Sequence, residues 1–203
     1  MRLLRYWWVF IIIIIFGSSF FEDDSKRDIK QVYEEPINLK QILDITVQEL
    51  LKGDALLINT NSKDKSIEAT WNFVDRYKIA LNNAFPKIHP TTIGVRPNQD
   101  ASFLAWDDIN LNDKWETELE DPIFLIEIDQ ARSRIIASSN FGTVDEIKTS
   151  GYPGFFSGFL VSSLLNRQSA AGVTSQKLAA KKPISAKSAA RSRAGSGSYK
   201  RGK

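Results

Sequence analysis

Calcium binding is the chemistry that residue types and spacing suggest most directly. The residues that suggest it lie in the acidic stretch 107–121, DDINLNDKWETELED. Asp108, Asn110 and Asn112 stand at alternate positions, as the first three ligands of a calcium loop do. Short side chains with oxygen atoms at this spacing turn inward on a tight coil and can surround one ion. The first half of the stretch therefore predicts a weak metal site.

The second half of the same stretch departs from the calcium pattern. Asp113 stands where the tight turn requires glycine, and Leu119 stands where a bidentate glutamate closes the site. Glu118 and Glu120 lie one position to either side of Leu119 and are the remaining candidate ligands. We therefore expect an acidic surface loop that binds no metal; the alternatives are a weak calcium site and a loop that pairs with the chain's own basic tail.

Outside this stretch, few side chains could take part in a reaction. The chain has no cysteine, which excludes disulfides, thiolate metal sites and cysteine nucleophiles. His89 is its one histidine, and the spacing supplies neither a nucleophile nor a partner to orient it. Phosphate-binding, serine-hydrolase and zinc-protease motifs are absent. We expect a non-enzymatic protein without a cofactor; the alternative is a calcium-binding or carboxylate-dependent hydrolytic enzyme that uses residues 107–121.

Residues 38–53, NLKQILDITVQELLKG, predict the first helix of the folded region. Asn38 is a suitable cap, apolar residues recur along one helical face, and Gly53 is a suitable stop. Residues 55–59 and 66–73 then predict a hairpin, because apolar and polar residues alternate in the second segment, and a helical stretch follows at 74–83. The competing interpretation is one continuous helix, in which the large apolar residues share a face. Those residues are Ile67, Trp71, Val74, Tyr77, Leu81 and Phe85.

Further strands are expected in the second half of the chain. Three prolines make residues 86–100 irregular apart from a short strand at 92–95, and 101–106 predict another strand. Residues 122–139 predict a second hairpin with its turn at 129–133. Strands grouped in hairpins favour an α+β fold: a small antiparallel sheet of hairpins with one N-terminal and one C-terminal helix.

The C-terminal helix is expected at Phe155–Leu165, where phenylalanine and leucine recur at helical spacing. Its other side bears small residues rather than charges, so neither side requires contact with water. A helix of eleven residues is too short to span a bilayer. We expect it to close over the sheet; the alternatives are a membrane-interface helix and a contact with a protein partner or a second copy.

A run of apolar residues near the N-terminus, YWWVFIIIIIFGSSFF at 6–21, predicts a single membrane-spanning segment that anchors the chain through residues 3–21. Two arginines precede the run and three acidic residues follow it, which places the N-terminus in the cytoplasm and the body outside. Two alternatives remain. The small residues at 17–19 resemble a signal-peptidase site, and cleavage near Ser19 would give a secreted or periplasmic protein. The run could also form a buried core strand.

Charge is strongly segregated along the chain. All 24 acidic residues lie within 22–146, and 16 basic residues leave 22–168 at a formal charge of −8. Residues 169–203 carry nine basic residues and no acidic one. We therefore expect four regions: a transmembrane anchor or signal peptide (1–21), a linker (22–37), an α+β domain (38–168) and a basic tail (169–203).

The tail has almost no large apolar side chain, so it is expected to be disordered. Its cations suit an anionic lipid, an anionic polymer or an acidic protein surface. They are Lys177, Lys181, Lys182, Lys187, Arg191, Arg193, Lys200, Arg201 and Lys203. Translocation of the body disfavours nucleic acid as the partner.

The C-terminal third contains FLIEID at 124–129 and ends in GSGSYKRGK at 195–203. Between them stand Tyr152, Phe155, Gly158, Phe159, Leu160, Ser163, Leu164 and Leu165. Through these positions it resembles an uncharacterised family of short exported bacterial proteins, a domain of unknown function. Members of that family usually carry a lipoprotein cysteine, which this chain lacks. The resemblance therefore implies export and leaves anchoring to residues 6–21, and it implies no activity or site residues.

Overall fold

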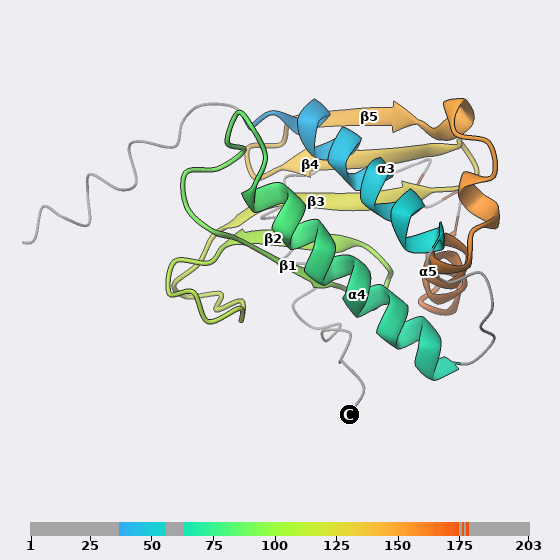
Figure 1. Cartoon of the computed structure of the whole chain (residues 1–203), viewed down its shortest axis with the longest axis horizontal. Helices are drawn as coiled ribbons and strands as arrows, with labels where there is room; N and C mark the ends of the chain where they lie inside the picture. Colours follow the sequence, from blue (N-terminus) through green and yellow to red (C-terminus); the bar gives the residue numbers. More distant parts are fainter. Residues whose placement is uncertain (1–36, 56–62, 175, 177, 179–203) are drawn as a thin grey trace, which may run out of the picture. The chain divides into compact units, whose positions relative to one another are not determined.

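Five antiparallel strands form a single sheet in the order β1-β2-β3-β4-β5, so each strand pairs with its neighbour along the chain. The computed structural model describes residues 37–55, 63–174, 176 and 178 (Figure 1). The strands are β1 (Ile93–Pro97), β2 (Phe103–Asp107), β3 (Pro122–Asp129), β4 (Arg134–Ser139) and β5 (Val144–Lys148). Together with three helices they confirm the predicted α+β fold with a small antiparallel sheet.

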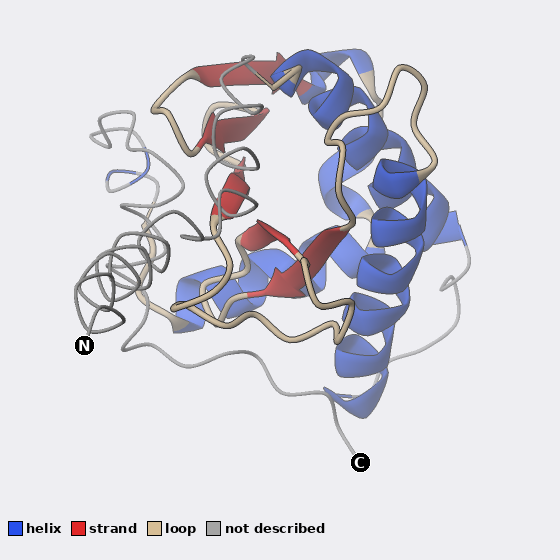
Figure 2. Ribbon diagram, turned by 90° about the vertical axis from the view of Figure 1, so that its left-hand side faces the viewer, coloured by secondary structure: helices blue, strands red, loops and turns tan. Residues whose placement is uncertain are grey.

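The helices are α3 (Leu39–Ala55), α4 (Lys63–Asn82) and α5 (Phe159–Ala170), with short 3-10 turns at Thr149–Gly151 and Phe155–Ser157. Helix α4 packs on β1, and α3 packs on β4 and β5, so the two helices lie side by side across one face of the sheet (Figures 1 and 2). Helix α5 contacts both of them. The main core fills the space between this helical layer and the sheet.

The predicted first helix is confirmed, and it begins as expected. The side-chain oxygen of Asn38 accepts a hydrogen bond from the backbone N–H of Gln41 at 3.1 Å, which satisfies one of the free donors of the first turn. The helix does not stop at Gly53 but continues to Ala55. A Cβ atom at Gly53 would lie 2.7 Å from the Leu160 side chain and 2.8 Å from that of Arg76. This glycine therefore allows close packing rather than ending the helix.

The predicted strand at 66–73 is wrong, because these residues belong to α4. The buried residues Phe73, Val74, Tyr77 and Leu81 are spaced three or four apart, which places them on one helical face toward the core. The Tyr77 hydroxyl lies 2.7 Å from that of Thr46 on α3, so this face also joins the two helices. The continuous-helix interpretation is therefore confirmed up to Asn82, but it is wrong for Phe85, which lies beyond the end of α4. Of the other predicted strand, 55–59, Ala55 belongs to α3 and the remainder lies outside the described residues.

The remaining strands largely follow the expectations. Strand β1 covers 93–95 of the predicted 92–95 and continues to Pro97, β2 covers most of 101–106, and β3 and β4 form the predicted hairpin around residues 130–133. Strand β5 was not predicted, since VDEIK has only two apolar residues and lies at an edge of the sheet. The meander therefore has one strand more than the hairpins predicted.

The C-terminal helix starts later than expected. Residues Phe155–Ser157 form a 3-10 turn, Gly158 is extended, and α5 begins at Phe159. Phe155, Leu160 and Leu164 are buried in the main core, but α5 packs mainly on α3 and α4 rather than over the sheet as expected. None of the helices in the described residues combines the length and the apolar character needed to cross a bilayer.

The expected region boundaries can be compared with the fold only in part. Helix α5 ends at Ala170, two residues beyond the expected domain end at 168, and Leu178 is buried, at 4% exposure. The predicted membrane segment, the linker up to residue 36 and residues 179–203 lie outside the described residues.

Candidate functional site

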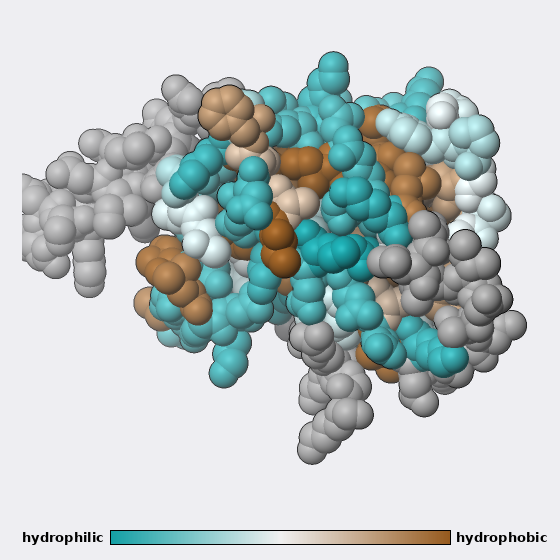
Figure 3. Space-filling view, viewed as in Figure 1, coloured by the Kyte–Doolittle hydropathy of each residue, from teal (hydrophilic) through white to brown (hydrophobic). Residues whose placement is uncertain are grey.

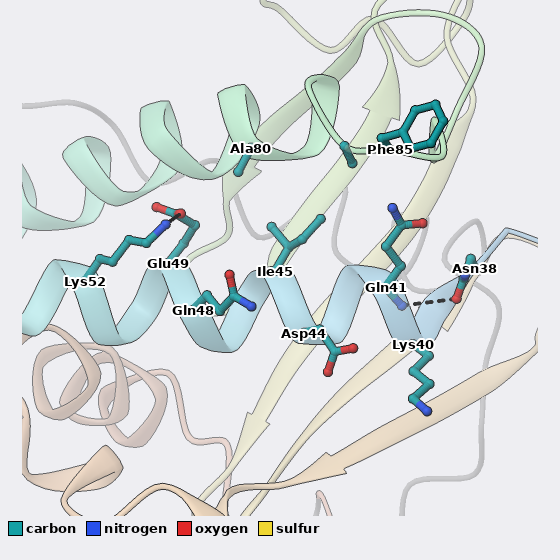
Figure 4. Close-up of a pocket in the computed structure, with 11 residues that line it drawn as sticks. Asn38, Lys40, Gln41, Asp44, Ile45, Gln48, Glu49, Lys52, Ala80 and Phe85 are labelled. Atoms are coloured by element: carbon teal, nitrogen blue, oxygen red, sulfur yellow. Dashed lines mark hydrogen bonds and ion pairs between the residues drawn. The ribbon is translucent and has the colours of Figure 1, made fainter.

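An open groove of about 460 Å³ runs between α3 and α4 on the side turned away from the sheet (Figure 4). Ile45 points from α3 toward α4, where Ala80 leaves room because its side chain is small (Figure 4). Ala84 lines the groove just beyond the end of α4. The groove lies on the face shown in Figure 3, where hydrophobic residues form separate groups among hydrophilic ones. The apolar part of the lining is therefore small and consists of Ile45, Ala80, Ala84 and Phe85.

Phe85 stands at one end of this groove and is 96% exposed. Its turn is held from both sides. The Gln41 side chain donates to the carbonyl of Pro86 at 2.9 Å, which ties the turn to α3. The Asn82 side chain donates to the carbonyl of Ile93 and accepts from its N–H, both at 2.9 Å, which ties the end of α4 to β1. The fold thus holds a large apolar side chain in water at a fixed place.

Charged residues of both signs border the groove. Lys40 and Asp44 lie on α3 at the outer edge of the groove and point away from α4 (Figure 4). Glu49 is only 5% exposed and lies 2.6 Å from Lys52 and 3.5 Å from Arg76. Glu49 is thus buried at the contact between the two helices, where Arg76 on α4 reaches across to it. No net charge dominates the border of the groove.

A second cavity, of about 530 Å³, lies beside the C-terminal end of α4. It is bordered by the loop before β1 and by the start of the acidic stretch. Its lining includes Lys78, Asn82, His89, Asp108 and Asp113. The fold therefore brings the one histidine of the sequence next to the stretch that suggested calcium binding.

His89 is the start of a hydrogen-bonded chain. Its Nδ1 lies 2.8 Å from the Thr91 hydroxyl, which donates to the Asp107 carboxylate. Because the hydroxyl hydrogen goes to Asp107, Nδ1 must carry the hydrogen that it donates to Thr91. Burial lowers the pKa of His89, and the negative charge of Asp107 opposes this shift in part. The histidine is thus a neutral structural donor, and it does not take a proton from Thr91.

Most side chains predicted to bind calcium do come together, but they bond to the loop itself. The two oxygens of Asp108 accept from the backbone N–H groups of Asn112 and Asp113, at 3.1 and 3.2 Å. The side-chain amides of Asn110 and Asn112 donate to Glu116 at 2.8 and 3.0 Å. Asp113 adopts a positive φ of 58°, the conformation that glycine would supply in a calcium loop. The backbone thus turns as the pattern predicts, while the oxygens serve as acceptors within the loop.

The two glutamates at the end of the pattern differ in their surroundings. Glu118 is exposed. Glu120 is 3% exposed, and its Oε2 accepts from the Glu116 N–H at 3.0 Å, whereas its Oε1 is buried without a hydrogen-bond partner in the described structure. Burial raises the pKa of Glu120, and the charges of Asp108 and Glu116 raise it further.

In the described ranges, no group of three or more histidine, aspartate or glutamate side chains could hold a metal ion. The nine basic residues expected to contact an anionic surface all lie outside those ranges. The site that the sequence did not point to is the groove beside Phe85. The contact between α3 and α4 that forms it follows only from packing. The continuous-helix interpretation placed Phe85 on the shared apolar face, whereas Phe85 lies beyond the end of α4 at Asn82 and is exposed.

Comparisons with known proteins do not assign the chain to a family. No protein-family model matches the chain, and neither the curated proteins nor the solved structures gave a match.

Proposed function

We propose that this chain is a non-enzymatic interaction module of a membrane-anchored or exported envelope protein, and that it binds a segment of a partner protein in the α3–α4 groove beside Phe85. The observation that carries the proposal is the 96% exposure of Phe85 on a turn held by Gln41 and Asn82. A flexible turn could fold such a side chain back onto the domain. A held turn keeps it available to a partner.

The energetic argument rests on the apolar area that stays in water. Burying a phenylalanine side chain stabilises a protein or a complex by roughly 1.5–3 kcal/mol, and aromatic residues are enriched at protein interfaces. The apolar floor formed by Ile45, Ala80 and Ala84 lies next to that ring and can receive a second apolar side chain. A partner that covers both would bury a continuous apolar strip.

The border of the groove indicates the chemistry of this partner. Lys40 and Lys52 lie on either side of Asp44 and Glu49 along α3, so the groove suits a segment with charges of both signs around one or two large apolar side chains. Nucleic acid fits poorly, because its phosphates would meet the two carboxylates. We therefore assign the groove to a peptide segment of another protein.

The place of action is proposed from the two ends of the sequence. The apolar run at 6–21, with arginines before it and acidic residues after it, supports a single-pass anchor with the body outside the cytoplasm, or a signal that releases the body. The nine cations after residue 168 support contact with anionic lipid or polymer. The groove and the tail would then engage different partners.

Photocrosslinking tests the groove directly. We replace Phe85 with a photoreactive phenylalanine analogue in the full chain and irradiate intact cells of the native host. The matched control carries the same analogue at Phe141, which is 63% exposed in the turn between β4 and β5. We expect a discrete crosslinked product from position 85 that is absent from position 141. Equal products at both positions, or none at 85, would contradict the proposal.

A further inference from the structure

The sheet has a second apolar face, turned away from α3 and α4. Opposite residues of an antiparallel pair share a face, and the register aligns Arg96 with Leu104, Leu104 with Leu125, and Leu125 with Ser138. Trp106 lies two residues beyond Leu104 and Ile136 two residues before Ser138, so both belong to the same face. We call these six residues the far face.

The apolar members of the far face are buried although no described helix lies on them. Leu104, Trp106, Leu125 and Ile136 are between 0% and 9% exposed, yet none belongs to the main core on the helical side. The described helices contact one another and the opposite face (Figure 2). Some other part of the chain must therefore cover this face.

The far face and its surroundings also contain buried N–H donors that need hydrogen-bond acceptors. The Trp106 ring lies over Gly94, where a Cβ atom would be 2.3 Å away, and the Arg96 guanidinium lies 4.2 Å from the centre of the Trp115 ring. Nε of Arg96 and Nε1 of both tryptophans are buried and donate to no acceptor in the described part of the chain. Burial of such donors is costly unless the covering segment supplies oxygen atoms.

Leu178 shows where the chain goes after α5. The end of α5 is tied to β3, since the Gln168 side chain donates to the carbonyl of Ile128 at 2.9 Å. Val173 and Leu178 then line a cavity of about 620 Å³ together with the turn between β3 and β4. Leu178 is 4% exposed and, like the far-face residues, lies outside the main core. The chain thus passes the end of the sheet with 25 residues still to come.

We infer that the far face is a docking site for the chain's own residues 179–190. Twelve extended residues reach about 40 Å, and five strands span roughly 20 Å, so the segment is long enough to cross the sheet. It carries Ile184 to extend the apolar contact and Ser185 and Ser188 as acceptors. Residues 6–21 also offer apolar area and three side-chain hydroxyls, but they form the proposed membrane anchor, whereas residues 179–190 directly follow Leu178. Docking would hold the last five cations, from Arg191 to Lys203, next to the sheet, where they could reach an anionic surface.

The absence of natural cysteine allows a test in the full chain. We pair Ser138→Cys, on the far face, with one second cysteine at a time at Ala180, Ser185 or Ser188, and add a short thiol crosslinker. The controls pair Ser138→Cys with Ser196→Cys or Ser198→Cys, beyond the proposed segment. We expect an intramolecular crosslink from at least one docked position and none from the controls. No crosslink from the docked positions, or equal yields from both groups, overturns the inference.

Thiol labelling identifies the occupant by a second route. Ser138→Cys should react with a maleimide about tenfold faster or more once residues 179–203 are removed, because a local cover has been lost. Removal of 191–203 alone should leave it protected. Ser139→Cys, which faces the helices, should stay slow throughout and shows that the shortened chain is folded. If Ser138→Cys reacts faster only after removal of residues 1–36, the N-terminal segment covers the far face and the inference is overturned. If its protection grows with protein concentration, a second copy covers the far face and the inference is likewise overturned. If Ser139→Cys also reacts faster in the shortened chain, that chain is not properly folded and the crosslinks in the full chain decide.

Discussion

Glu120 places a carboxylate in the interior of the acidic loop, beside Asp108 and Glu116. Its raised pKa means that the folded state holds the proton more firmly than the unfolded state does. As the pH rises through the ordinary glutamate pKa, the unfolded chain loses its proton first, so stability falls until the folded carboxyl has ionised as well. At neutral pH the Glu120 carboxylate therefore lowers the free energy of unfolding.

Glu120→Gln should remove that destabilisation. The uncharged amide no longer repels the neighbouring carboxylates, and its oxygen can still accept from the Glu116 N–H. We expect the melting temperature at pH 7 to rise by a few degrees and the difference from the natural chain to vanish below about pH 4, where the natural carboxyl is protonated. The measurement is a circular dichroism melt of the full chain in detergent. Glu118→Gln, an equal charge change at an exposed position, is the control; the same rise there would contradict the local explanation.

His89 should give a pH dependence of the opposite sign. Its pKa is lowered in the fold, so protonation favours the unfolded chain, and stability should be lost as the pH falls from about 6.5 toward the folded pKa. His89→Asn should flatten the stability curve in that window and leave its shape above pH 7 unchanged. Unfolding in urea at half-unit steps of pH measures this difference. Identical slopes for both chains would show that burial does not lower the pKa of His89 in the fold.

At the scale of elements, the sequence predicted those whose patterns are unambiguous. The cap at Asn38 and the hairpin around residues 130–133 are confirmed, because a capping side chain and a polar turn between apolar runs are local signals. The strand predicted at 66–73 is wrong because its apolar residues fit both the period of 2 of a strand and the period of 3.6 of a helix. Packing against Thr46 and the sheet favours the helix. The contact between His89, Thr91 and Asp107 joins residues 16 and 18 positions apart, which no spacing rule could predict.

The join between α4 and β1 depends on Asn82. Asn82→Ala removes both hydrogen bonds to Ile93 and leaves a backbone N–H and C=O of the edge strand without their partners. We expect a loss of about 1–3 kcal/mol in the free energy of unfolding. The control is Asn83→Ala at the neighbouring exposed position, and urea unfolding measures both. Equal losses would show that the bonds of Asn82 do not fix this join.

The close approach of Trp106 to β1 depends on Gly94. A methyl group there would fall 2.3 Å from the indole ring, which is held within the far face and cannot move away freely. Gly94→Ala should therefore destabilise the fold by about 1–3 kcal/mol, as overpacking does. Gly151→Ala, where nothing lies within 4 Å of the added atom, should change stability by less than about 0.5 kcal/mol. A Gly94→Ala chain as stable as the control would show that Trp106 is not confined.

At the scale of the whole molecule, the charges divide the chain into parts with different surroundings. The stretch 22–168 has a formal charge of −8 and the tail one of +9, so anionic membranes repel the first and attract the second. The buried residue Leu178 and the nearby far face suggest how the tail could be kept close to the folded part. The side of the membrane on which the body is proposed to lie, however, depends on the charges around the N-terminal apolar run.

The orientation of the chain is tested by a reporter that fluoresces only in the cytosol, fused after Lys203. Two arginines before the apolar run should hold the N-terminus inside, so the body and the reporter are translocated and we expect no fluorescence. The matched control replaces both Arg2 and Arg5 with glutamate and adds two lysines after residue 24, which should reverse the charge bias and give fluorescence at the cell periphery. Bright peripheral fluorescence from the natural chain would place the body in the cytoplasm, and diffuse fluorescence would remove the anchor. In either case the partners of the groove would have to be sought among cytoplasmic proteins, because the contacts that hold Phe85 do not depend on which side of the membrane the body lies.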